Sequence, residues 1–71
     1  MRPRFFIPEI ESVGEVVVLS LDESRHLCQV LRLGVNDEIC VFDGRGSEYL
    51  ARIEGVARAG ATVRVVEPTV P

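Results

Sequence analysis

The chain has 71 residues, 46% hydrophobic and 27% charged, and its formal net charge is −3 at pH 7. This length allows one domain with a modest core, and the hydrophobic share excludes a disordered chain. The acidic balance argues against a generic nucleic-acid binder, because Lys and Arg supply sequence-independent affinity for phosphates. All eight basic residues are Arg, whose planar guanidinium can grip phosphate bidentately and stack on bases. Their placement therefore matters more than their number.

The sequence also argues against membrane, secreted and zinc-binding classes. No apolar run approaches the roughly 20 residues of a membrane helix, and the apolar run after the basic start, residues 5–7, is too short for a signal peptide. We expect a soluble, cytoplasmic protein with no membrane partner. Cys28 and Cys40 lack CxxC spacing, and the single His26 leaves too few soft ligands for zinc. We predict reduced, largely buried thiols and no metal site.

Two strands are predicted in the first part of the chain. Residues 2–7 alternate with the two-residue period of a strand. One face carries Arg2, Arg4 and Phe6, and the other carries Phe5 and Ile7. Residues 15–19 form a continuous run rich in Val, which predicts a second strand buried on both faces.

A capped helix follows the second strand. Ser20 and Glu23 have the S-x-x-E spacing of a capping box. The helix is predicted to run to about Leu33, with Gly34 as the left-handed residue that ends it. Its apolar stripe is expected to carry Leu27, Val30 and Leu31, with His26 at the rim and Arg25, Gln29 and Arg32 on the opposite side.

The remainder predicts three strands that follow a turn at 34–37. They span residues 38–42, 48–56 and 62–67, and the turns at 43–46 and 58–61 contain residues that tolerate positive φ. One face of these strands is apolar and needs a cover. The predicted fold is mainly β, a small β-barrel with one capped α-helix that plugs one end. The domain is expected to span residues 1–67, and the two prolines in 68–71 predict the start of a linker to a further domain.

No catalytic centre is evident in the sequence. The one histidine has no nucleophile motif beside it, and Asp22 and Glu23 fit helix capping better than an acid–base pair. The glycine-rich segment 43–46 lies between strands and opens no helix, which favours a hairpin turn over a nucleotide-binding loop. Arg45 at its tip could still contact a nucleic-acid backbone.

The arginines form two predicted clusters. Arg2 and Arg4 share one strand face, and Arg25 and Arg32 share one helix face. Such clusters can hold phosphates. The alternative is that they are solvated charges paired with nearby acids, as most exposed arginines are.

Several ordered motifs carry a family resemblance. They are Arg4-Phe5-Phe6, His26-Leu27, Val30-Leu31-Arg32-Leu33, Asp37, and Phe42-Asp43-Gly44 with Gly46, Glu48 and Tyr49. In this order and spacing, over residues 2–66, the chain resembles the N-terminal domain of the RsmE family. Members of that family are bacterial enzymes that methylate N3 of a uridine in small-subunit ribosomal RNA.

The resemblance implies a PUA-like barrel that helps to bind ribosomal RNA and takes part in rRNA processing. It also implies a separate knotted SPOUT domain that binds S-adenosylmethionine and forms a homodimer, so this chain should hold no cofactor. Arg4, His26 and Arg32 fall on the family's motif positions. Asn36 in place of the common Gly, and the lack of lysine, depart from the family pattern. The second departure predicts weak RNA binding by this domain alone.

The RNA-binding residues predicted from these observations are Arg2, Arg4, Arg25, His26, Arg32 and Arg45. No catalytic residue is predicted in this chain, and the parent is expected to be a methyltransferase that uses S-adenosylmethionine. A competing hypothesis is a structural or protein-interaction barrel that docks on its own catalytic domain or on a dimer mate. The acidic balance favours that alternative.

Overall fold

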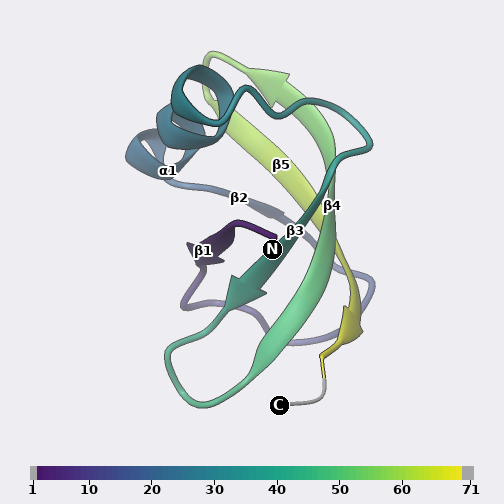
Figure 1. Ribbon diagram of the computed structural model, residues 1–71. Helices are drawn as coiled ribbons and strands as arrows, with labels where there is room; N and C mark the ends of the chain where they lie inside the picture. The colour runs from purple at the N-terminus through teal and green to yellow at the C-terminus, as the bar shows by residue number, and fades with distance from the viewer. Residues whose placement is uncertain (1, 70–71) are drawn as a thin grey trace.

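The computed structural model describes residues 2–69, which form one curled five-stranded sheet and one short helix. The elements are β1 (Arg4–Phe6), β2 (Val16–Val18), α1 (Leu21–Arg25) with a π-helical turn (His26–Val30), β3 (Glu38–Phe42), β4 (Glu48–Ala57) and β5 (Gly60–Pro68). The strand order is β1-β3-β4-β5-β2, and β1 with β3 is the parallel pair in an otherwise antiparallel sheet. The helix lies at one end of the curled sheet, beside the β4–β5 turn, and the β3–β4 loop lies at the other end (Figure 1). The predicted mainly β fold with one helix at its end is confirmed.

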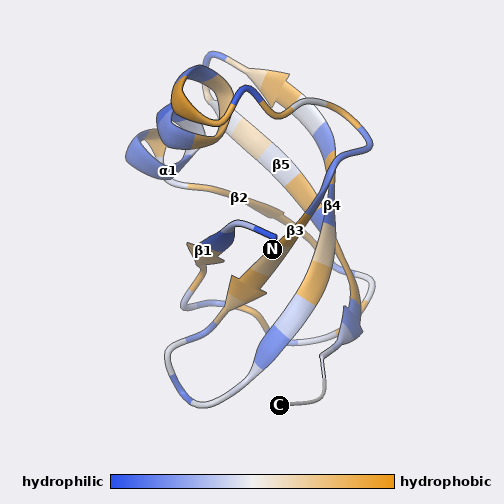
Figure 2. Cartoon of the chain, viewed as in Figure 1, coloured by the Kyte–Doolittle hydropathy of each residue, from blue (hydrophilic) through white to orange (hydrophobic). Residues whose placement is uncertain are grey.

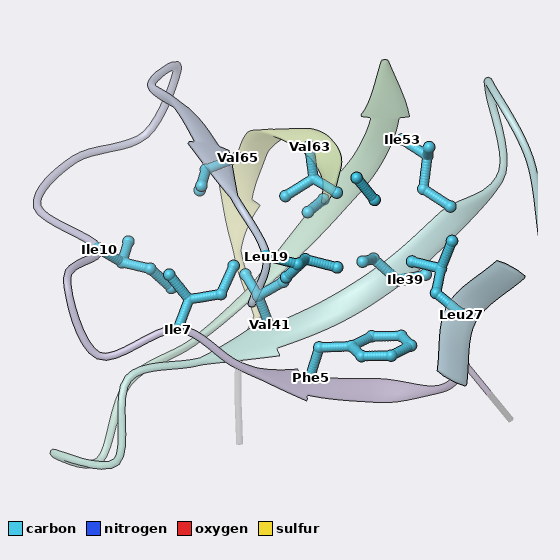
Figure 3. Packing of buried hydrophobic residues seen from close by; sticks show 12 residues of the cluster. Phe5, Ile7, Ile10, Leu19, Leu27, Ile39, Val41, Ile53, Val63 and Val65 are labelled. Carbon is cyan, nitrogen blue, oxygen red and sulfur yellow. The ribbon is translucent and has the colours of Figure 1, made fainter. Parts of the chain in front are cut away.

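The core fills the inside of the curl. Hydrophobic and hydrophilic residues alternate along β4 and β5 (Figure 2), as a sheet with one buried face requires. Leu27 comes from the helix side and Phe5 from β1, and both point into the cluster (Figure 3). The buried residues are Phe5, Ile7, Ile10, Leu19, Leu27, Ile39, Val41, Ala51, Ile53, Ala61, Val63 and Val65.

The helix is anchored by two serines. The Ser20 hydroxyl accepts a hydrogen bond from the Glu23 amide at 3.2 Å, which confirms the predicted N-cap. The buried Ser24 hydroxyl accepts from the Ala61 amide at 2.8 Å and donates to the Leu19 carbonyl at 3.4 Å. These bonds join α1 to β5 and to the residue that follows β2.

The prediction for the second half of the helix is wrong. The Leu31 amide donates to the His26 carbonyl five residues back, at 3.0 Å, so this turn is π rather than α. A wider turn rotates later residues off the expected stripe, and Val30 is 66% exposed although Leu27 is fully buried. Arg32 has a φ of 54° and takes the left-handed position predicted for Gly34. Arg32 therefore lies beyond the helix and does not share a helix face with Arg25.

The two edge strands are shorter than predicted. The alternation in β1 is confirmed, since Phe5 and Ile7 are buried while Arg4 and Phe6 are exposed. Burial of β2 on both faces is wrong, because Val16 and Val18 are 47% and 59% exposed. In the described part of the chain, no helix or strand covers the outer face of β2. Only the inward side chain of Val17 packs against the core.

The end of β5 extends past its predicted limit at Glu67. Pro68 pairs with Tyr49 of β4, and the Thr69 amide donates to the Glu48 carbonyl at 2.9 Å. The first two residues of the predicted linker 68–71 are thus held against the sheet. Residues 70–71 of that linker lie outside the described part of the chain.

Candidate functional site

The outer face of β1 and β3 carries an arginine–aromatic cluster, formed by Arg4, Phe6 and Phe42. The parallel pairing places Phe6 beside Phe42, and their ring centroids are 5.5 Å apart with an interplanar angle of 41°. The Arg4 guanidinium carbon lies 4.8 Å from the Phe42 centroid, within the roughly 6 Å range of a cation–π contact. Phe42 therefore contacts both Phe6 and Arg4, and these contacts order the cluster without a ligand.

The β3–β4 loop packs against this cluster. Gly44 has a φ of 75°, and a Cβ there would come within 2.9 Å of the Phe6 ring. Asp43 accepts hydrogen bonds from the amides of Arg45 at 2.8 Å and Ser47 at 3.1 Å. The bond from the Arg45 amide is the main cause that lowers the pKa of the Asp43 carboxyl. This is the predicted hairpin turn, and it fixes where the loop meets the Phe6 ring.

Two of the predicted arginines are in ion pairs. Arg2 contacts Glu38 at 3.2 Å, and Arg4 contacts Glu48 at 2.9 Å. These two arginines are thus paired with nearby acids, as the alternative expected. Exposed pairs contribute only about 0–1 kcal/mol, so an incoming phosphate could replace either glutamate at little cost.

Arg4 and His26 line one shallow hollow with Ser20, Asp22 and Glu23. The His26 ring meets the buried Phe5 ring edge to face, with centroids 6.3 Å apart. Phe5 thus supports the His26 ring from the core side. The structure brings together two of the three residues at the family's motif positions, although the two acids reduce the positive potential of the hollow.

The other predicted residues lie elsewhere. Arg25 lines a separate hollow with Arg58, between the helix and the β4–β5 turn. Arg45 donates to the Pro8 carbonyl at 2.8 Å and ties the β3–β4 loop to the segment after β1. Arg32 follows the π-helical turn. The six predicted residues therefore do not form one continuous site.

Sequence reasoning missed two residues of this surface, Phe42 and Glu48. Both fall within the motif that carries the family resemblance, so a signal was present in the sequence. Their role depends on the pairing of β1 with β3 and on the Arg4–Glu48 contact. Neither can be read from a local pattern, because the partners are about 40 residues apart.

The remaining features concern the cysteines, metal-ligand groups and long apolar helices. Cys28 and Cys40 are free and partly buried rather than largely buried. Within residues 2–69 no group of three or more His, Cys, Asp or Glu side chains is placed to hold a metal ion. No helix in the described part of the chain is long and apolar enough to cross a membrane.

Comparison with known proteins gives one family match and several similar structures. A model of the RNA methyltransferase PUA domain matches residues 18–66, whereas no curated protein sequence matches. The ribosomal RNA small subunit methyltransferase E of Neisseria gonorrhoeae, solved with S-adenosyl methionine, is 35% identical with a TM-score of 0.89. A probable rRNA methyltransferase of Porphyromonas gingivalis is also 35% identical, with a TM-score of 0.81. A putative methyltransferase of Legionella pneumophila, solved with the same cofactor, is 26% identical with a TM-score of 0.88.

These structures are much longer than the chain. The alignments cover 100%, 97% and 97% of the chain for the Neisseria, Porphyromonas and Legionella proteins, but only 29%, 28% and 28% of those proteins. The curled sheet thus corresponds to less than a third of each relative.

Proposed function

Because this chain belongs to the family of RNA methyltransferase PUA domains, we propose that it docks small-subunit ribosomal RNA for a methyltransferase. The single observation that carries this proposal is the family match over residues 18–66. The similar structures support it, since two carry rRNA methyltransferase in their names and two contain S-adenosylmethionine. The domain presents RNA, and the methyl transfer takes place outside residues 1–67.

In this proposal, a SPOUT domain joined through the segment from residue 68 onward binds S-adenosylmethionine and forms the homodimer. That domain transfers the methyl group to N3 of a uridine in the small-subunit RNA. The enzyme works in the cytoplasm, where the ribosomal RNA lies. The role of the present domain is to hold structured RNA so that the target base reaches the catalytic domain.

The RNA contacts are assigned first to Arg4 and His26, which share one hollow. Arg2 lies near them in sequence on the β1 side, and Arg45 lies on the adjacent β3–β4 loop. Arg25 and Arg32 contribute weaker contacts from the helix end. Contacts of this kind recognise phosphates and RNA shape more than base sequence. The net charge of −3 keeps the affinity of the domain alone low.

A second candidate function is docking on another protein domain. Two observations favour it: the ion pairs already occupy Arg2 and Arg4, and the outer face of β2 exposes Val16 and Val18. On this hypothesis, the barrel braces the catalytic domain or a dimer mate and makes no RNA contact.

The two functions are separated by titrating the protein with a small-subunit rRNA fragment at several salt concentrations. Phosphate contacts predict an affinity that falls with salt, with a log–log slope of about −0.7 to −0.9 per contact. The double variant R4A/R32A should bind more weakly and show a smaller slope. The matched control R52A removes an exposed arginine from β4 outside the proposed contacts. Absence of binding at low salt, or equal binding by R4A/R32A and R52A, contradicts RNA docking.

A further inference from the structure

We propose that Phe6 is a stacking platform for one unpaired RNA base. This inference rests on the proposed RNA-binding function and deepens it, because it names the part of the RNA that the β1 side recognises. The two phenylalanines of β1 lie on opposite faces of the strand. Phe5 points inward and is buried, whereas Phe6 points outward and is 45% exposed. Burial of a phenylalanine ring is favourable by about 1.5–3 kcal/mol, so a ring left this exposed is available to a ligand.

The ring is held before any ligand arrives. Phe42 contacts it from β3 at a centroid distance of 5.5 Å, and Gly44 lies against its edge. The glycine matters here, because a Cβ at this position would be only 2.9 Å from the ring. A side chain fixed in this way loses little rotamer freedom on binding, which favours affinity.

Shallow hollows adjoin the ring and its partner. One is lined by Phe6, Ile7, Pro8, Glu9, Val18, Ser20 and Glu23. The other is lined by Arg4, Phe42, Gly44, Gly46, Ser47 and Glu48. A flat base can therefore rest on the Phe6 ring while the rest of its nucleotide lies over the polar groups of either hollow.

The surroundings favour a base over a protein surface or a bare phosphate. A stable protein interface buries about 1,200–2,000 Å² in total and has an apolar centre, but on this face the ring lies beside the Arg4–Glu48 ion pair. A phosphate has no flat π face to stack on the ring, whereas the carboxylates of Glu23 and Glu48 in these hollows can accept hydrogen bonds from the N–H groups of a base edge. Unpaired bases stacked on aromatic side chains are a common mode of RNA recognition.

The test uses Phe6→Trp as a reporter, because the chain contains no tryptophan. An indole at this exposed position keeps an aromatic face, and a stacked base should quench its fluorescence. The RNA probes are a single-stranded oligonucleotide and a duplex of the same sequence. We expect quenching by the single strand, little quenching by the duplex, and an affinity of Phe6→Trp at least equal to that of the wild type.

Two matched variants complete the test. Phe6→Leu keeps an apolar side chain without a π face and should bind the single strand about 5- to 150-fold more weakly, the range for loss of one base stack. Val13→Trp places the reporter at another exposed site, in the segment before β2 and outside the proposed contacts, and should bind without quenching. Circular dichroism and thermal unfolding check that each variant is folded.

The outcomes separate this inference from the proposed function. Equal binding by wild type and Phe6→Leu, with no quenching of Phe6→Trp, overturns the stacking platform and leaves RNA docking intact. Absence of RNA binding by the wild type overturns both. A dimer in sedimentation experiments that Phe6→Leu dissociates also overturns the inference, because it assigns the ring to a protein contact.

Discussion

β1 and β2 are the two edges of one sheet, and each is three residues long. Both send inward residues to the core and leave the others exposed. Their exposed residues differ in kind, because β1 presents Arg4 and Phe6 whereas β2 presents Val16 and Val18. Residues of both strands, Phe6 and Val18, line one of the hollows next to Phe6.

The neighbours of the two edges explain the difference in chemistry. Beside β1, β3 and the following loop supply Phe42 and Gly44, which hold an exposed aromatic ring in place. Beside β2, Arg64 of β5 contacts Glu54 at 2.6 Å and donates to the Gly14 carbonyl at 2.9 Å. That arginine braces the chain at the start of β2. The β1 edge therefore presents a held aromatic ring beside an arginine, whereas the β2 edge presents valines next to a bracing ion pair.

The largest expected effect separates the two faces of β1. Phe5→Ala removes a ring that is 1% exposed and should lower the free energy of unfolding by about 3–5 kcal/mol. Phe6→Ala removes an exposed ring and its contact with Phe42, which should cost about 0.5–1.5 kcal/mol. Urea denaturation followed by circular dichroism measures both, and equal losses would show that the outer face of β1 is structural.

The next effect concerns glycines near β2. Gly60 has a φ of 134°, and a Cβ there would lie 2.9 Å from the Leu19 carbonyl oxygen. Gly60→Ala should therefore destabilise the fold by about 1–3 kcal/mol. Gly14 also has a positive φ, of 91°, but no atom lies within 4 Å of its Cβ position. Gly14→Ala is the control for backbone strain alone, and thermal unfolding should rank it as the milder change.

A smaller effect tests whether Glu48 competes with RNA for Arg4. Glu48→Gln removes the ion pair on the β1 side and should tighten RNA binding by up to about fivefold, the equivalent of an exposed pair. Glu54→Gln changes the net charge equally but breaks the pair with Arg64 near β2. Filter binding at one salt concentration should show no gain for this control. Equal gains would mean that only the net charge matters.

The smallest effect is a pH dependence on the β2 side. The hydrogen bond from Arg64 holds the pKa of Glu54 below its ordinary value of 4.5. A carboxyl with a lowered folded pKa contributes stability above the unfolded pKa, and this contribution is lost as the pH falls through the folded pKa. Thermal unfolding between about pH 6 and pH 3 should therefore show a shallower acid slope for Glu54→Gln. An unchanged slope would show that the Glu54–Arg64 ion pair does not contribute to the acid dependence of stability.

Local patterns in the sequence were sufficient for much of the fold. The alternation in β1, the Ser20 cap and the glycine turns follow from short-range chemistry, and the structure confirms them. No local pattern marks the π-helical turn, on either side of which Leu27 and Leu33 pack against the core. The exposure of β2 was missed because a run of valines has the same pattern at an edge as in a buried strand.

The candidate site was less predictable than the fold. The period of β1 placed Arg4 and Phe6 on one face, but their partners Phe42 and Glu48 come from strands distant in sequence. Arg32 was placed on the helix by a period that the π-helical turn interrupts. The pairing of strands that are distant in sequence therefore decides which predicted residues come together. Short-range patterns in the sequence give no information about this pairing.

RNA binding on the β1 side is tested most directly by an NMR titration of the labelled protein with a small-subunit rRNA fragment. Amide shifts are expected to change along residues 4–6, 20–26 and 40–48. No change is expected at residues 13–16, which lead into β2. Changes confined to residues 13–18, or no change at saturating RNA, would contradict RNA binding on the β1 side.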